Sequence, residues 1–192
     1  MQAVLAAPLA YTQGPGSCRH DVEDTEIAVR RNLLVTVIGN RNSGKSRTWN
    51  TLFGATVRTG KELRRLPLSE AEFVDVFLVS GSPEERDEYV GDLITVERPR
   101  IVLCSLQYRE DVWQSFQYFF ENDYSAFVHW LNPGYSDDPV QQFDSLGLIP
   151  RLLSAPTVVG IRDGIANLNS RVEELRQYIY GWADGNDLIN EF

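Results

Sequence analysis

The chain contains few residues of the kinds that bind transition metals or form disulfides. Its 192 residues include two cysteines, Cys18 and Cys104, and two histidines, His20 and His129. These four residues do not form the paired spacing of a zinc site, and two cysteines supply no disulfide framework. We therefore expect a reducing, cytoplasmic setting, with Cys104 as a buried thiol and His129 as a core or sheet-edge histidine.

Long apolar runs and excess positive charge are also absent. No run approaches the ~18 residues of a membrane span, and a composition of 43% hydrophobic and 23% charged residues is typical of soluble globular proteins. Eighteen basic and 27 acidic residues give a net charge of -9, which repels anionic membranes and nucleic-acid backbones. We expect no membrane association and consider nucleic acid an unlikely partner. The basic cluster between Arg58 and Arg65 is interpreted as a solvated face, with contact to phosphate or nucleic acid as the alternative.

The sequence divides into a short extension and one domain. Residues 1–31 have no hydrophobic period and contain the breaker Gly14-Pro15-Gly16, so we interpret them as an N-terminal extension, flexible or adding an edge strand through "TEIAVRR". Residues 32–192 alternate short apolar runs with amphipathic stretches. This alternation predicts an α/β domain with a mostly parallel central sheet flanked by helices.

Apolar runs and helical spacing give the approximate positions of the elements. The predicted strands are 33–38, 74–80, 100–106, 125–131 and 157–161. The predicted helices are 45–53, 84–94, 109–121, 139–147 and 165–181. For the segment 55–68 the sequence allows two interpretations, a polar hairpin or a loop with a short edge strand.

The segment "GNRNSGKS", residues 39–46, follows the first apolar run and precedes a predicted helix. It fits the phosphate-binding pattern G-x-x-x-x-G-K-S/T in the strand and helix context that this pattern requires. Glycines let backbone N–H groups approach phosphate oxygens, the lysine places a charge beside the β- and γ-phosphates, and the serine hydroxyl binds Mg²⁺. The predicted nucleotide-binding residues are Gly39, Asn40, Arg41, Asn42, Ser43, Gly44, Lys45, Ser46 and Arg47, with Lys45 also catalytic and Ser46 a metal ligand.

Residues 33–54 resemble the P-loop NTPase superfamily. The segment "GNRNSGKSRTWNTLFG" is most similar to the first motif of translation-factor-type GTPases, through Asn42, Asn50, Leu52 and Gly54. The resemblance implies a three-layer α/β fold and a site for ATP or GTP with Mg²⁺.

A second Mg²⁺-binding acid at the end of a neighbouring strand is not found cleanly. The strand "VDVFLV" ends in Ser80-Gly81-Ser82, where a GTPase has D-x-x-G. Ser80 is the candidate to contact Mg²⁺ through water, and Glu84 or Glu85 is the candidate to orient the attacking water. The alternative is that "SPEERDEY" simply begins a helix, with Ser82 as N-cap, Pro83 at the first position and acids in the first turn.

The guanine-reading motif N-K-x-D is absent. After "AFVHWL" the chain has Asn132 followed by Pro133 and Gly134, and Asp163 is first of all a helix-cap residue and only secondarily a candidate purine ligand. We expect a nucleoside-triphosphate hydrolase with slow or partner-activated turnover. The alternatives are a nucleotide-binding switch without turnover and a phosphotransferase.

The stretch "DVWQSFQYFFENDY" contains more aromatic residues than one buried helical face requires. One interpretation is a core-packing helix. The other is an exposed surface that binds a protein partner or a second copy of the chain.

Overall fold

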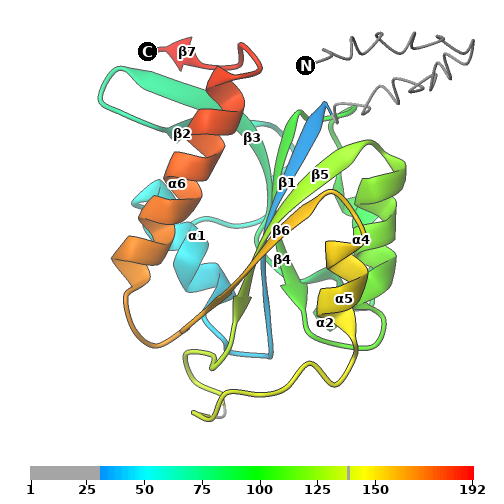
Figure 1. Cartoon of the computed structure of the whole chain (residues 1–192). Helices are drawn as coiled ribbons and strands as arrows, with labels where there is room; N and C mark the ends of the chain where they lie inside the picture. The colour runs from blue at the N-terminus through cyan, green and yellow to red at the C-terminus, as the bar shows by residue number, and fades with distance from the viewer. Residues whose placement is uncertain (1–30, 138) are drawn as a thin grey trace, which may run out of the picture.

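The computed structural model describes residues 31–137 and 139–192, and the predicted extension therefore lies outside the described residues except for Arg31. In this part the chain is an α/β structure whose mixed, mostly parallel sheet has the strand order β2-β3-β4-β1-β5-β6, with β7 beside β3 (Figure 1). The strands are β1 (Asn32–Gly39), β2 (Arg64–Pro67), β3 (Glu72–Val79), β4 (Ile101–Gln107), β5 (Tyr124–Leu131), β6 (Thr157–Arg162) and β7 (Asn190–Glu191). The helices are α1 (Lys45–Phe53), α2 (Pro83–Arg86), α3 (Val90–Leu93), α4 (Val112–Glu121), α5 (Leu148–Leu153) and α6 (Leu168–Asp184).

Side chains of β1 alternate between two hydrophobic clusters, one on each face of the sheet. Leu33 and Val37 pack in the cluster that contains buried residues of α1 and α6, whereas Leu34 and Ile38 pack with residues of α4 and α5. Figure 1 shows the same division, with α1 and α6 on one side of the sheet and α4 and α5 on the other. Because β1 is covered on both faces, its run is apolar except for the buried Thr36, whose hydroxyl donates to the Cys104 carbonyl (2.8 Å).

All five predicted strands are confirmed, with ends within two residues of the expected ones. Pairing of β1 with β4 and β5, of β3 with β4, and of β5 with β6 is parallel. The segment 55–68, which the sequence left open, contains the short edge strand β2, paired antiparallel with β3. In the described part of the chain no helix is both long and apolar enough to cross a membrane.

The prediction of one helix over 84–94 is wrong, because two short helices stand there instead. Asp87 ends α2 with a left-handed backbone (φ 52°), and α3 begins three residues later at Val90. Aspartate tolerates this conformation better than most residues. Ser82 is the N-cap residue of α2 as expected, but its side chain makes no capping hydrogen bond.

The helix predicted over 139–147 is also wrong. The described residues of that segment form a loop, and α5 begins only at Leu148. Asn132 bonds both the N–H and the carbonyl of Gln142 (2.8 and 2.6 Å), and Asp144 accepts the N–H groups of Leu148 and Ile149 (3.0 and 2.7 Å). Such side-chain bonds satisfy backbone groups without a helix.

The aromatic helix α4 packs into the core. Phe116 and Phe119 are fully buried, and Trp113, Tyr118 and Phe120 are partly buried against the same cluster. The core-packing interpretation is therefore confirmed, and a protein partner or self-association stays a prediction. Cys104 is a buried free thiol, as expected.

His129 is fully buried on β5, and its Nε2 lies 3.3 Å from Oε2 of Glu174 on α6. Burial lowers the pKa of His129 to about 4, although the Glu174 carboxylate opposes this shift. A histidine in the unfolded chain has a pKa of about 6.5, so the unfolded state binds more protons between these values. We expect the free energy of unfolding to decrease as the pH falls from 6.5 towards 4, by up to about 3 kcal/mol.

Urea unfolding of the wild type and of His129→Gln at pH 7 and at pH 4.5 tests this expectation. The variant should lose less stability between the two pH values than the wild type does. An identical pH dependence in both proteins would show that the pKa of His129 is the same in the folded and the unfolded chain.

Candidate functional site

The predicted phosphate-binding segment forms the turn between β1 and α1. Asn42 and Gly44 both have positive φ values (63° and 99°), and α1 begins at the next residue, Lys45. Glycine adopts this conformation without strain. A cavity of about 650 Å³ lies over this turn, within the range of roughly 300–1,000 Å³ typical of ligand sites. The residues that line it are Arg41, Asn42, Ser43, Gly44, Lys45, Ser46, Arg47, Glu85, Tyr135 and Ser136.

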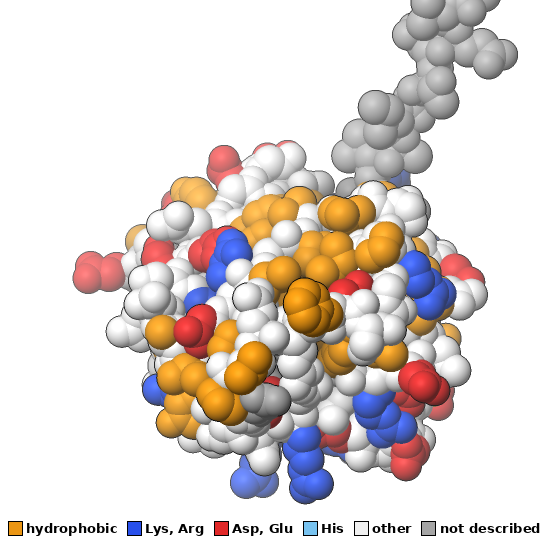
Figure 2. Space-filling view, turned by 60° about the horizontal axis from the view of Figure 1, so that its bottom comes forward, with side chains coloured by type: hydrophobic (Ala, Val, Ile, Leu, Met, Phe, Trp, Pro, Cys, Tyr) orange, Lys and Arg blue, Asp and Glu red, His pale blue; other side chains and the backbone are white. Residues whose placement is uncertain are grey.

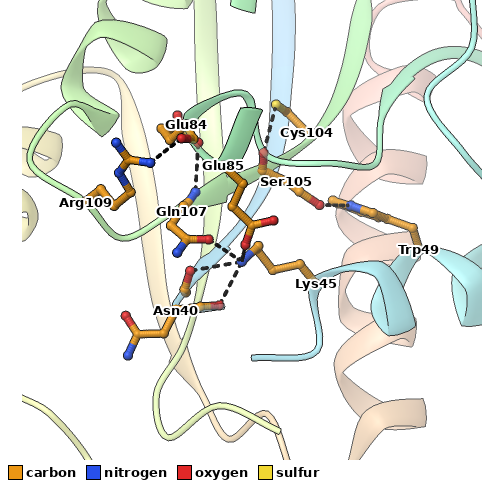
Figure 3. A network of polar contacts seen from close by, with 10 residues as sticks. Asn40, Lys45, Trp49, Glu84, Glu85, Cys104, Ser105, Gln107 and Arg109 are labelled. Atoms are coloured by element: carbon orange, nitrogen blue, oxygen red, sulfur yellow. Dashed lines mark hydrogen bonds and ion pairs between the residues drawn. The ribbon is translucent and has the colours of Figure 1, made fainter. Parts of the chain in front are cut away.

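The Lys45 ammonium lies at the junction of the turn and the strand ends (Figure 3). Its Nζ donates to the carbonyls of Gly39 (3.1 Å) and Asn40 (2.8 Å) and lies 3.5 Å from Oε1 of Gln107. The Glu85 carboxylate is 3.6 Å from Nζ. Burial lowers the pKa of Lys45, and the charge of Glu85 opposes that shift. Gly39 and Asn40 thus contact the lysine through their carbonyls and do not line the cavity.

Two further loops support the turn. After β5, the N–H of Tyr135 donates to the Ser43 carbonyl (2.9 Å), and the N–H of Ser136 donates to the Asn42 carbonyl (3.0 Å). The Arg47 guanidinium lies 4.2 Å from the centre of the Tyr135 ring. After β6, Gly164 approaches so closely that a Cβ there would lie 2.7 Å from the Ser43 carbonyl oxygen. The turn is therefore held between the ends of three strands.

Gly164→Ala should disturb this arrangement directly. A Cβ at this position would also lie 2.9 Å from backbone atoms of Gly134, so the loops must move apart at a cost of about 1–3 kcal/mol. Thermal unfolding should show the loss. Gly181→Ala is the matched control, because a Cβ there meets nothing within 4 Å and helix α6 should gain about 0.5–1 kcal/mol. Equal stability of the two variants would contradict the close contact of the three loops.

The strands beside β1 are β4 and β5, and β3 lies one strand beyond β4. Gln107, at the end of β4, pairs in register with Gly39 and therefore takes the strand-end position next to the turn. Ser80 follows β3, is 8% exposed, and is not among the cavity-lining residues. Its N–H donates to Oγ1 of Thr59 (3.0 Å). The predicted metal ligand Ser80 therefore does not line the cavity over the turn.

The two candidate acids of α2 point in different directions. Glu85 lines the cavity beside Lys45. Glu84 is 4% exposed, accepts the Gln107 N–H (2.9 Å) and the Ser115 hydroxyl (2.6 Å), and does not line the cavity. Burial raises the pKa of Glu84, and these two hydrogen bonds oppose that shift. Of the two predicted acids, only Glu85 is placed to act on a bound group.

The described cavity wall has too few metal-binding side chains to hold a metal ion by itself. Its oxygen donors suit Mg²⁺ that is already bound to phosphate. Among the described residues no group of three or more histidine, cysteine, aspartate or glutamate side chains is placed to hold a metal ion. The cavity wall does contain oxygen donors, among them the exposed Ser46 hydroxyl and the Glu85 carboxylate. Mg²⁺ usually takes one or two protein oxygens and completes its coordination with phosphate and water.

The two positions considered for base recognition are engaged locally. Both polar atoms of the Asn132 amide bond the backbone of Gln142. Oδ1 of Asp163 accepts the N–H groups of Ile165 and Ala166 (2.7 and 3.1 Å), as a turn-forming aspartate does before a helix. These contacts favour the structural interpretation of both residues.

The sequence reasoning missed Gln107, Tyr135 and Ser136. No motif marks these positions, and only the order of the strands places them beside the turn. Gly39 ends β1, Gly44 immediately precedes α1, and Lys45 and Ser46 begin α1, which is the strand, turn and helix order that the P-loop pattern requires. Comparisons of the chain with protein-family models, curated proteins and solved structures find no match, so the resemblance to P-loop NTPases is based on these residues alone.

Proposed function

We propose that this chain is a P-loop protein that binds ATP or GTP with Mg²⁺ and hydrolyses it slowly or when a partner activates it. The observation that supports this function best is the position of Lys45. It is the first residue of a helix that follows a central parallel strand, and it lines a cavity at the carboxyl end of that strand. Open α/β sheets bind ligands at the carboxyl ends of their strands.

The charge of the cavity suits a phosphate chain. Arg41, Lys45 and Arg47 line it, against a single carboxylate among the lining residues, that of Glu85. The whole chain has a net charge of -9, so this positive wall is a local feature. The nine-residue helix α1 also directs the positive end of its dipole towards the cavity.

Ser46 and Glu85 are the residues that would hold Mg²⁺ in this cavity. When bound, the ion neutralises charge on the β- and γ-phosphate oxygens. Lys45 would exchange its present carbonyl and carboxylate partners for phosphate oxygens, and Arg41 and Arg47 would add positive charge at the rim.

The strand-end residue beside the turn supports slow turnover. An acid at this position usually binds Mg²⁺ directly or through water, whereas the chain has the neutral Gln107. The Glu85 carboxylate is already paired with Lys45. Activation by a protein partner is consistent with the loop after β5, which exposes Tyr135 at the cavity and Val140 and Phe143 further along the chain. Figure 2, which turns this end of the sheet towards the reader, shows hydrophobic patches beside Lys and Arg side chains.

A nucleotide-binding switch without turnover is the second candidate, and the same neutral Gln107 favours it. The two functions differ in phosphate release and share the binding step. A phosphotransferase would need an acceptor site, for which the described residues give no specific argument.

Isothermal titration with ATP and with GTP in Mg²⁺, paired with phosphate release from the same samples, tests the proposal. We expect saturable binding of at least one nucleotide with slow release of phosphate. Binding without release would favour the switch. No binding of either nucleotide would contradict both functions.

A further inference from the structure

The side chains of Glu85 and Lys45 lie next to each other in the wall of the proposed phosphate cavity (Figure 3). Their charged atoms are 3.6 Å apart, and the two side chains are 36% and 7% exposed. The Lys45 ammonium is therefore paired with an acid of its own chain, and this acid stands where a phosphate group must approach.

Contacts of the preceding residue hold Glu85 in this position. The buried Glu84 carboxylate bonds the Gln107 N–H at the end of β4 and the Ser115 hydroxyl of α4. The Arg109 guanidinium donates to the backbone carbonyl of Glu84. Since α2 is only four residues long, contacts that hold Glu84 also set the orientation of the whole helix. They therefore direct the Glu85 side chain towards the cavity.

The charge of Glu85 has opposite effects on two forms of the same ligand. A metal-free triphosphate brings several negative charges beside the Glu85 carboxylate, which is 36% exposed, and like charges a few ångströms apart repel each other even where water screens them in part. It must also compete with the carboxylate for Lys45. A divalent cation between the carboxylate and the phosphates turns this repulsion into attraction, because carboxylate and phosphate oxygens can both bind it.

We propose that Glu85 is a specificity-determining residue that makes the cavity reject metal-free triphosphate and accept the Mg²⁺ complex. This inference rests on the proposed function and names the form of nucleotide that the site takes. The carboxylate, rather than a general affinity of the positively charged turn for anions, sets this selectivity.

Glu85→Gln is the direct test, because glutamine keeps the size of the side chain and removes its charge. The matched control is Glu88→Gln, which removes an acid paired with Arg86 (3.6 Å) outside the cavity wall. Isothermal titration with ATP and with GTP would be run for each protein, once in Mg²⁺ and once in EDTA.

For the wild type and Glu88→Gln we expect binding in EDTA at least 30-fold weaker than in Mg²⁺. Glu85→Gln should bind the metal-free nucleotide at least tenfold more tightly than the wild type does. Its preference for the Mg²⁺ complex should shrink accordingly. Glu85→Ala, checked by circular dichroism, should give the same result if the glutamine variant folds poorly.

Two outcomes would overturn the inference. In the first, the affinity of Glu85→Gln in EDTA equals that of the wild type while the wild type still binds in Mg²⁺; the proposed function then survives without this role for Glu85. In the second, the wild type binds neither nucleotide in Mg²⁺, which rejects the proposed function together with the inference.

Discussion

Lys45→Ala should weaken binding of ATP or GTP about 100-fold, because the loss of a charge-assisted hydrogen bond to phosphate is worth roughly 3 kcal/mol. Lys45 is 7% exposed and its ammonium bonds the Gly39 carbonyl at the end of β1, whereas Arg41 and Arg47 line the same cavity as exposed side chains. Isothermal titration in Mg²⁺ measures the change.

The fold should survive this substitution. Two of the present partners of Lys45 are backbone carbonyls at the edge of a cavity, where water can replace the ammonium. Lys61, the only other lysine of the sequence, is exposed and supplies the control Lys61→Ala. If Lys45→Ala and Lys61→Ala bind nucleotide as tightly as the wild type, the turn is not a phosphate site.

The strands were predictable because their signal is local. Each parallel strand of the centre is covered on both faces, and its apolar run is visible without knowledge of its neighbours. The order of the strands is not local. Sequence reasoning placed the strand-end group at Ser80, whereas β4 separates β3 from β1 and brings Gln107 beside the turn.

The helix prediction over 139–147 failed because side chains satisfy the backbone there. Asn132 lies ten residues before Gln142, yet its amide occupies both backbone groups of that residue. A periodic pattern in the segment 139–147 cannot reveal such a contact. The long helix α6 was predictable, because its buried residues Val172, Leu175 and Ile179 recur at helical spacing.

The turn itself was predictable because its residues are contiguous, whereas its surroundings were not. Lys45 and Ser46 belong to one motif, but Glu85 reaches the same cavity from α2 and Tyr135 from the loop after β5. Only the short α2, with Glu84 turned inward, distinguishes two adjacent acids that looked equivalent in sequence.

Trp49→Ala should destabilise the protein by about 3–5 kcal/mol, the usual cost of removing a fully buried tryptophan. Trp49 is 0% exposed, lies in α1, and packs in the cluster shared by α1, α6 and the sheet. Its Nε1 donates to Oγ of the buried Ser105 (2.8 Å), which ties α1 to β4. Domains are stable by only about 5–15 kcal/mol, so chemical denaturation should show a large shift of the midpoint.

Trp113→Ala is the control, because it removes the same type of side chain from a partly buried position in α4. It should lower the free energy of unfolding distinctly less than Trp49→Ala does. Trp49→Phe, combined with Ser105→Ala in a double-mutant cycle, separates the hydrogen bond from the packing. Equal losses for Trp49→Ala and Trp113→Ala would contradict the anchoring of α1 through Trp49. Because Lys45 begins the helix that Trp49 anchors, Trp49→Ala should also weaken nucleotide binding, whereas Trp113→Ala should leave binding unchanged.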